Sequence, residues 1–165
     1  AARFLKEGGA HAVKLEGGQR ILPQVEALVG AGIPVMGHLG LTPQSVNALG
    51  GYRVQGRGGA GERLLRDAKS LEAAGAFAVV LEVVPAALAE RVTAALSIPT
   101  IGIGAGNACD AQVNVWQDLV GLTPAPRPKF VRAYADVRSI MADAVRAWSE
   151  DVVSGAYPAH EHSYE

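Results

Sequence analysis

The sequence predicts an α/β fold in which parallel strands alternate with helices, and two observations support this prediction. The run AVVLEVVP at 78–85 contains one charged residue, Glu82, and no glycine. Such a run is typical of a strand buried on both faces, as in parallel sheets. Five strand-like segments alternate with helices and loops along the chain, which is the pattern of a parallel sheet covered by helices.

Polar residues near the ends of successive predicted strands favour a (β/α)8 TIM barrel over an open doubly wound sheet. They are Lys14, Glu16, His38, Glu82 and the turn 104–107. Chemistry in such barrels gathers at one end of the strands, and a complete barrel takes about 250 residues. We therefore expect residues 1–165 to be a single domain covering about the last five βα units, with the N-terminal strands of the barrel absent from this sequence.

The five strands are expected at 12–16, 34–38, 78–85, 98–103 and 111–115. In the first of them, AVKLE, Lys14 and Glu16 occupy alternate positions and should point to the same face. Helices are expected at 22–29, 62–74, 85–96 and 136–153, where apolar residues recur at helical spacing. A partial helix precedes Gly8. Thr42 and Pro43 resemble an N-cap and first helical residue, and the glycine-rich stretch 50–61 predicts a long, functional loop.

The composition excludes several classes of function. A net charge of -1 and an aromatic content of 5% offer neither a general attraction for nucleic acid nor a stacking surface for bases. No apolar run is long enough to cross a membrane, and the first residues do not resemble a signal peptide. The single cysteine, Cys109, rules out an internal disulfide and weakly indicates a reducing compartment.

Glu82 is the strongest candidate for chemistry, because a lone carboxylate in an apolar strand needs a partner, a metal ion or a proton. It could act as a general base, or it could be a Glu that bridges to a neighbouring loop. Lys14 and Glu16 could bind an anion and a metal, or form an ordinary ion pair at a strand end. His38 could orient a substrate oxygen or shuttle a proton, or serve only as a structural residue.

Three other features carry weaker signals. The GxGxG run at 102–106 lacks the spacing of a dinucleotide fingerprint, and we interpret it as backbone that approaches a ligand or neighbour closely. Cys109 has no basic neighbour in sequence that would favour a thiolate. His160 and His162 lie with Glu161 in an aperiodic tail and are expected to be solvated.

Six motifs, in order along the whole chain, resemble the ketopantoate hydroxymethyltransferase (3-methyl-2-oxobutanoate hydroxymethyltransferase) family. They are VKLEGG at 13–18, GHLGLTPQS at 37–45, GGYRVQGR at 50–57, LEVVP at 81–85, IGIGAG at 101–106 and EHS at 161–163. The resemblance implies a cytoplasmic (β/α) barrel enzyme of pantothenate biosynthesis that forms a homo-oligomer, typically a decamer. Such an enzyme transfers a one-carbon unit from 5,10-methylenetetrahydrofolate to 3-methyl-2-oxobutanoate with Mg²⁺ bound, giving 2-dehydropantoate.

The resemblance also implies a role for each candidate residue. Glu16 matches a carboxylate ligand of the metal, Lys14 a residue that binds the keto acid, and Glu82 the proton acceptor, while His38 matches a position lining the same pocket. The family's other metal ligands are two aspartates on earlier strands, which this sequence does not contain. The full-length protein is therefore expected to be an enzyme and this fragment alone is not. The alternatives are another Mg²⁺-dependent 2-oxo-acid barrel enzyme of the lyase type, or an inert truncated barrel.

Overall fold

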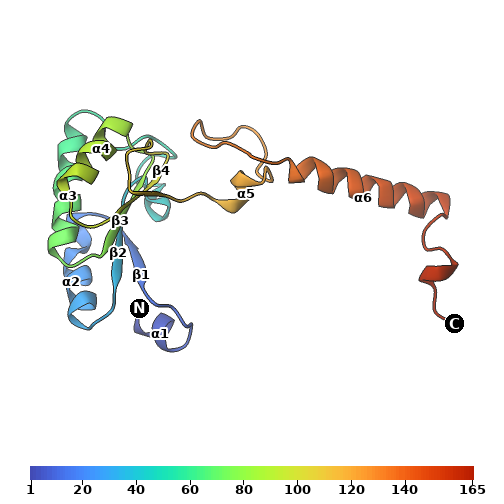
Figure 1. Ribbon diagram of the computed structural model, residues 1–165, viewed down its shortest axis with the longest axis horizontal. Helices are drawn as coiled ribbons and strands as arrows, with labels where there is room; N and C mark the ends of the chain where they lie inside the picture. The colour runs from blue at the N-terminus through green and yellow to red at the C-terminus, as the bar shows by residue number, and fades with distance from the viewer. The chain divides into compact units, whose positions relative to one another are not determined.

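A computed structural model describes residues 1–165, which divide into two compact units, Ala1–Val113 and Asn114–Glu165. The first unit contains a parallel sheet whose strands follow one another in the order β1-β2-β3-β4-β5 (Figure 1). The strands are β1 Val13–Glu16, β2 Val35–Gly40, β3 Ala78–Glu82, β4 Thr100–Ile103 and β5 Ala111–Gln112. The predicted α/β class with a parallel sheet is confirmed, whereas barrel closure and the single domain over 1–165 stay predictions.

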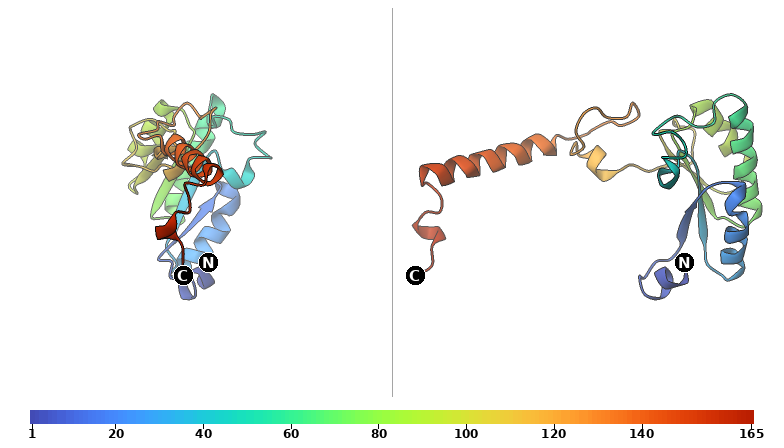
Figure 2. Two further views of the ribbon diagram at one scale, coloured as in Figure 1. Left: turned by 90° about the vertical axis from the view of Figure 1, so that its right-hand side faces the viewer. Right: turned by 180° about the vertical axis from the view of Figure 1, so that it is seen from behind.

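Three longer helices cover one side of this sheet (Figures 1 and 2). They are α2 Leu22–Gly30, α3 Gly59–Ala73 and α4 Ala86–Ala95, and a short helix, α1 Ala2–Lys6, precedes β1. Helix α3 buries Leu64, Ala68 and Leu71, spaced so that they share one face. It begins three residues before the predicted start, so residues 59–61, which were expected in the glycine-rich loop, belong to the helix.

The apolar core of the first unit lies between the sheet and these helices. Alternate residues of the strands reach it, including Val35 and Leu39 from β2 and Val79 and Leu81 from β3. A strand exposes its side chains to opposite faces in turn, so Met36 and His38 of β2 and Val80 and Glu82 of β3 point away from the helices. That opposite face carries the candidate functional residues.

Further differences from the sequence-based expectations lie at the end of β3, in β5 and after Thr42. Strand β3 ends at Glu82 rather than at Pro85, because Val83 has a positive φ of 49° that interrupts the extended backbone. Strand β5 contains two residues instead of five, and its pairing with β4 is limited to Ala111 and Gln112. The Thr42 side chain makes no capping hydrogen bond, and the predicted helix start is a single 3-10 turn, Pro43–Ser45.

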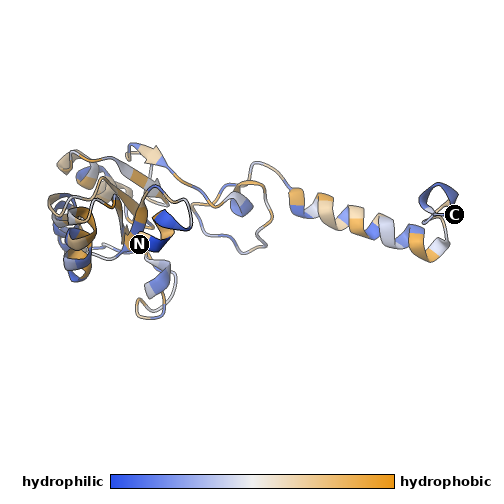
Figure 3. Ribbon diagram, turned by 90° about the horizontal axis from the view of Figure 1, so that it is seen from below, coloured by the Kyte–Doolittle hydropathy of each residue, from blue (hydrophilic) through white to orange (hydrophobic).

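The second unit contains the helices α5 Trp116–Leu119 and α6 Val137–Ser154 and a 3-10 turn, His160–His162. Helix α6 lies within one residue of its expected bounds. Its N-cap Asp136 accepts a hydrogen bond from the Ser139 N–H, and Gly155 ends it in a left-handed conformation. Apolar and polar segments alternate along α6 (Figure 3), and no residue of this helix is buried. None of the helices has the combined length and apolarity needed to cross a membrane.

Candidate functional site

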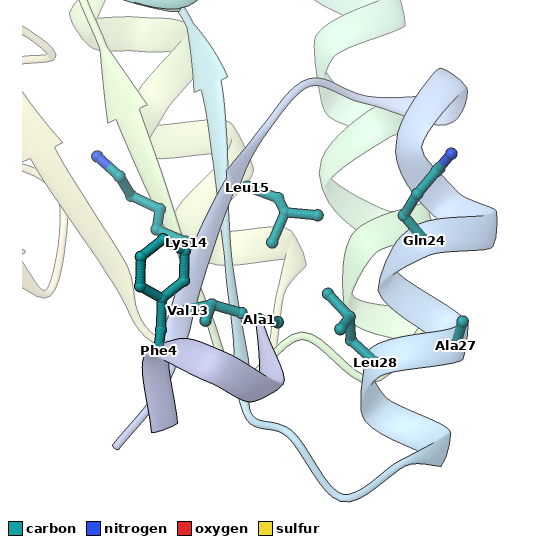
Figure 4. Close-up of a pocket in the computed structure, with 8 residues that line it drawn as sticks. All are labelled: Ala1, Phe4, Val13, Lys14, Leu15, Gln24, Ala27 and Leu28. Carbon is teal, nitrogen blue, oxygen red and sulfur yellow. The ribbon is translucent and has the colours of Figure 1, made fainter. Parts of the chain in front are cut away.

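Strand register brings the candidate residues of β1, β2 and β3 to the same face of the sheet. Glu16 pairs with His38, and Gly40 pairs with Glu82, so the carboxylates and the imidazole follow one another across three neighbouring strands. Figure 4 shows that Lys14 and Leu15 project from opposite sides of β1. Lys14 and Glu16 therefore share a face, as the alternation of the strand predicts.

His38 lies between two carboxylates. Its Nδ1 atom is 3.6 Å from Glu16 Oε1, and its Nε2 atom is 3.1 Å from Glu82 Oε2. The His38 side chain is 2% exposed, and those of Glu16 and Glu82 are 9% and 16% exposed. Neither ring nitrogen makes a hydrogen bond of acceptable geometry. Buried polar groups are nearly always hydrogen bonded in folded proteins, so an unsatisfied imidazole between two acids indicates a functional site.

Glu16 is held in place by its second oxygen. Glu16 Oε2 accepts a hydrogen bond from the Gln44 N–H at 3.0 Å, which ties the carboxylate to the Pro43–Ser45 turn after β2. Glu16 Oε1, the oxygen nearer His38, accepts no hydrogen bond. This oxygen is available to a ligand.

Lys14 precedes Glu16 by two residues on β1 and pairs with Met36 of β2. It is exposed and makes no ion pair with an acidic residue, so the alternative interpretation of a Lys14–Glu16 ion pair is not observed. The structure thus brings Glu16, His38 and Glu82 into direct contact and leaves the ammonium of Lys14 free on the same face.

An apolar groove of about 470 Å³ follows the free edge of β1 (Figure 4). Leu15 of β1 and Leu28 of α2 line it, and Phe4 of α1 lies at its border. Strand β1 pairs with β2 alone, so the backbone groups on its other edge have no partner strand. The backbone groups along such an edge can pair with another strand.

The glycine turn after β4 is held by a hydrogen-bond network that the sequence did not indicate. Asp110 Oδ2 accepts hydrogen bonds from the Thr100 N–H and hydroxyl at 2.8 and 3.0 Å, and the Thr100 and Thr93 hydroxyls are 2.8 Å apart. These bonds hold the pKa of Asp110 below its ordinary value. The turn leads into strand β5 rather than a helix, so it lacks the strand–turn–helix context of a dinucleotide fingerprint.

The remaining candidates stay outside this site. Cys109 packs partly buried against the apolar core. His160 and His162 are exposed, and His162 Nδ1 accepts a hydrogen bond from the Ala159 N–H. Sequence reasoning missed Gln44, Thr100 and Asp110, because no pattern in the chain reveals which backbone N–H a distant side chain will meet.

A magnesium ion fits this donor set only in part. No group of three His, Cys, Asp or Glu residues could enclose a metal ion. Mg²⁺ is nevertheless often held by one or two carboxylates, with waters and substrate oxygens as its other ligands. Glu16, with its Oε1 atom free of hydrogen bonds, fits as one such ligand.

The model of the ketopantoate hydroxymethyltransferase family matches residues 1–160. The chain is also similar to proteins named 3-methyl-2-oxobutanoate hydroxymethyltransferase. Identity is 70% with the protein of Frankia casuarinae, 68% with that of Frankia alni and 61% with that of Acidothermus cellulolyticus, over 99% of this chain and 55%, 54% and 60% of those proteins. The chain thus spans little more than half the length of these relatives. Since the family model covers nearly all of it, the chain belongs to the ketopantoate hydroxymethyltransferase family.

Proposed function

We propose that this chain is the part of a (β/α)8 barrel enzyme that contains the general base, Glu82. The enzyme transfers a hydroxymethyl unit to 3-methyl-2-oxobutanoate, with 5,10-methylenetetrahydrofolate as donor. The contact of His38 with both Glu16 and Glu82 carries this proposal, because it joins a candidate ligand and a candidate base in one buried cluster. Membership of the family supports the reaction, its place in pantothenate biosynthesis, and a cytoplasmic homo-oligomer.

Barrel closure is part of the same proposal. The strands follow their chain order with no reversal, whereas a doubly wound sheet reverses its order where the helices change face. The longer helices of the first unit cover one side only (Figures 1 and 2). The unpaired edge of β1 and its apolar groove would pack against the preceding βα unit of a closed ring.

Each residue has a defined task in the proposed mechanism. Glu82 removes the proton from C3 of the keto acid. Water hydrolyses the two C–N bonds of the folate methylene bridge, giving tetrahydrofolate, whose nitrogens take up protons, and formaldehyde. The electron pair left on C3 bonds to the formaldehyde carbon, and the π pair of its C=O bond moves to the oxygen, which takes up a proton and becomes the hydroxyl of the product. Lys14 binds the negative charge of the substrate. His38 lies beside the Glu82 carboxylate on the face opposite the helices, and Glu16 would provide a ligand for Mg²⁺. When bound, Mg²⁺ supplies Lewis acidity toward the keto acid oxygens.

The proposal is testable in a hybrid enzyme, defined as the Frankia casuarinae relative in which residues 1–165 replace the matching segment. Their 70% identity makes this exchange conservative. The wild-type hybrid should turn over 3-methyl-2-oxobutanoate only when methylenetetrahydrofolate is added. Turnover without folate would favour a 2-oxo-acid lyase, and an inactive but folded hybrid would favour an inert fragment.

Glu82→Gln in the hybrid should abolish the exchange of the C3 proton into deuterated water. We expect a loss of about 10²- to 10⁴-fold, the range for removal of a general base. Exchange is followed by proton NMR without the folate donor, and keto acid binding by calorimetry should survive. Glu90→Gln, an exposed carboxylate on α4, is the matched control. Undiminished exchange in Glu82→Gln would remove Glu82 from the base role.

A further inference from the structure

Val83 is the only residue other than glycine with a positive φ, at 49°. A β-branched side chain is poorly tolerated in this left-handed region, because its Cβ substituents crowd the backbone. Strained backbone of this kind persists only where the surrounding structure enforces it, and it occurs often beside functional groups. Val83 directly follows Glu82.

The left-handed residue changes the face to which the chain points. In a continuous strand, residues 82 and 84 would lie on the same face of the sheet. Here Val84 is buried in the helix-covered core together with Leu81, whereas Glu82 contacts His38 on the opposite face. The turn at Val83 therefore fixes Val84 in the core without drawing Glu82 toward the helices.

Three backbone hydrogen bonds hold this turn. The Val83 N–H donates to the Ile103 carbonyl at 2.8 Å, the Gln55 N–H donates to the Val83 carbonyl at 2.9 Å, and the Leu41 N–H donates to the Glu82 carbonyl at 2.8 Å. A Cβ atom on Gly40 would collide with the Glu82 carbonyl oxygen, so the neighbouring strand also requires a glycine there. Gln55 belongs to the glycine-rich loop, which is thus attached to the end of β3.

We propose that the Gln55 N–H and the left-handed Val83 form a positioning device for Glu82, in which the glycine-rich loop fixes the direction of the base. This inference rests on the proposed role of Glu82. The loop acts through the Val83 backbone and need not touch the substrate.

Gln55→Pro in the hybrid enzyme removes the N–H that donates to Val83, and Gln55→Ala keeps it. We expect Gln55→Pro to slow C3 proton exchange about 10- to 100-fold, as for a reacting group displaced by about 1 Å. The KM for the keto acid should stay within about twofold, because substrate-binding Lys14 is untouched. Gln55→Ala should match the wild-type hybrid. Val83→Asn, which tolerates the left-handed region and keeps both hydrogen bonds, should also retain exchange.

Wild-type exchange in Gln55→Pro would overturn the proposal, as would an equal loss in Gln55→Ala. If Gln55→Pro does not fold, an ester in place of the amide at residue 55 removes the same N–H, and the same two outcomes decide. Glu82→Gln separates this inference from the function on which it rests. Full exchange in Glu82→Gln would reject the base itself, whereas loss in Glu82→Gln with full exchange in Gln55→Pro would reject only the positioning device.

Discussion

The two faces of the sheet differ in whether their buried polar groups are hydrogen bonded. On the helix-covered face, Thr100 is fully buried, and both its N–H and its hydroxyl are hydrogen bonded to Asp110. On the other face, His38 is as deeply buried, yet neither of its nitrogens has a hydrogen bond of acceptable geometry. The polar groups of Thr100 are thus fully hydrogen bonded within the protein, whereas the two His38 nitrogens remain able to hydrogen bond to a ligand.

Within a single strand, residues that stabilise the fold and residues of the candidate site point to different faces. Neighbouring residues Leu81 and Glu82 point to different faces, one into the apolar core and one toward His38. On the helix-covered face, a substitution should mainly lower the free energy of unfolding, because it exposes or removes buried apolar surface. On the opposite face, a substitution should mainly lower metal affinity or proton transfer, because it removes a ligand or a proton acceptor. Substitutions on the two faces can therefore test the comparison independently.

Leu81→Ala should give the largest loss of stability. Leu81 is fully buried, and truncation of such a leucine lowers the free energy of unfolding by about 2–5 kcal/mol through lost contacts and a residual cavity. Urea denaturation of the 165-residue chain measures this change. The control Val54→Ala, in the glycine-rich loop, should cost less than about 0.5 kcal/mol. A Leu81→Ala chain as stable as wild type would show that the helix-covered face is not the main source of stability.

The sequence predicted the strands and helices well where apolar periodicity is strong, as in α3 and β3. It also predicted that Lys14 and Glu16 share a face, because alternation along a strand is a local property. The end of β3 was wrong by three residues, since the valines at 83 and 84 continue an apolar run and contain no sign of a left-handed turn. That turn depends on partners from β4 and the glycine-rich loop, which lie far away in sequence.

Glu16→Gln should have a smaller effect than Leu81→Ala on stability, and its main effect should be on metal affinity. Gln keeps the shape of the side chain but removes the negative charge that a hard cation prefers. We expect Mg²⁺ affinity of the hybrid enzyme to fall about tenfold, a change of about 1.4 kcal/mol. Calorimetric titration with Mg²⁺ measures it, with the exposed Glu26→Gln of α2 as control. Unchanged affinity would exclude Glu16 as a ligand.

The contact between Glu16 and His38 could not be predicted from the sequence, although both residues were. Each residue was identified singly from its place near a strand end, but the contact between them depends on the register of β1 against β2. Register follows from packing of the opposite face against the helices, which a single sequence does not specify. The site was therefore predicted as a list of residues rather than as a connected cluster.

Asp110→Asn should give the smallest effect, and one that depends on pH. Hydrogen bonds from Thr100 lower the pKa of Asp110 in the folded chain. A carboxylate whose pKa is lowered by folding contributes stability above its unfolded pKa, and this contribution is lost as the pH falls through the folded pKa. The urea midpoints of wild type and Asp110→Asn should therefore differ at pH 7 and converge in acid. A difference that is equal at both pH values would mean that the charge of Asp110 does not contribute, and no difference at either pH would mean that Thr100 needs only a neutral acceptor.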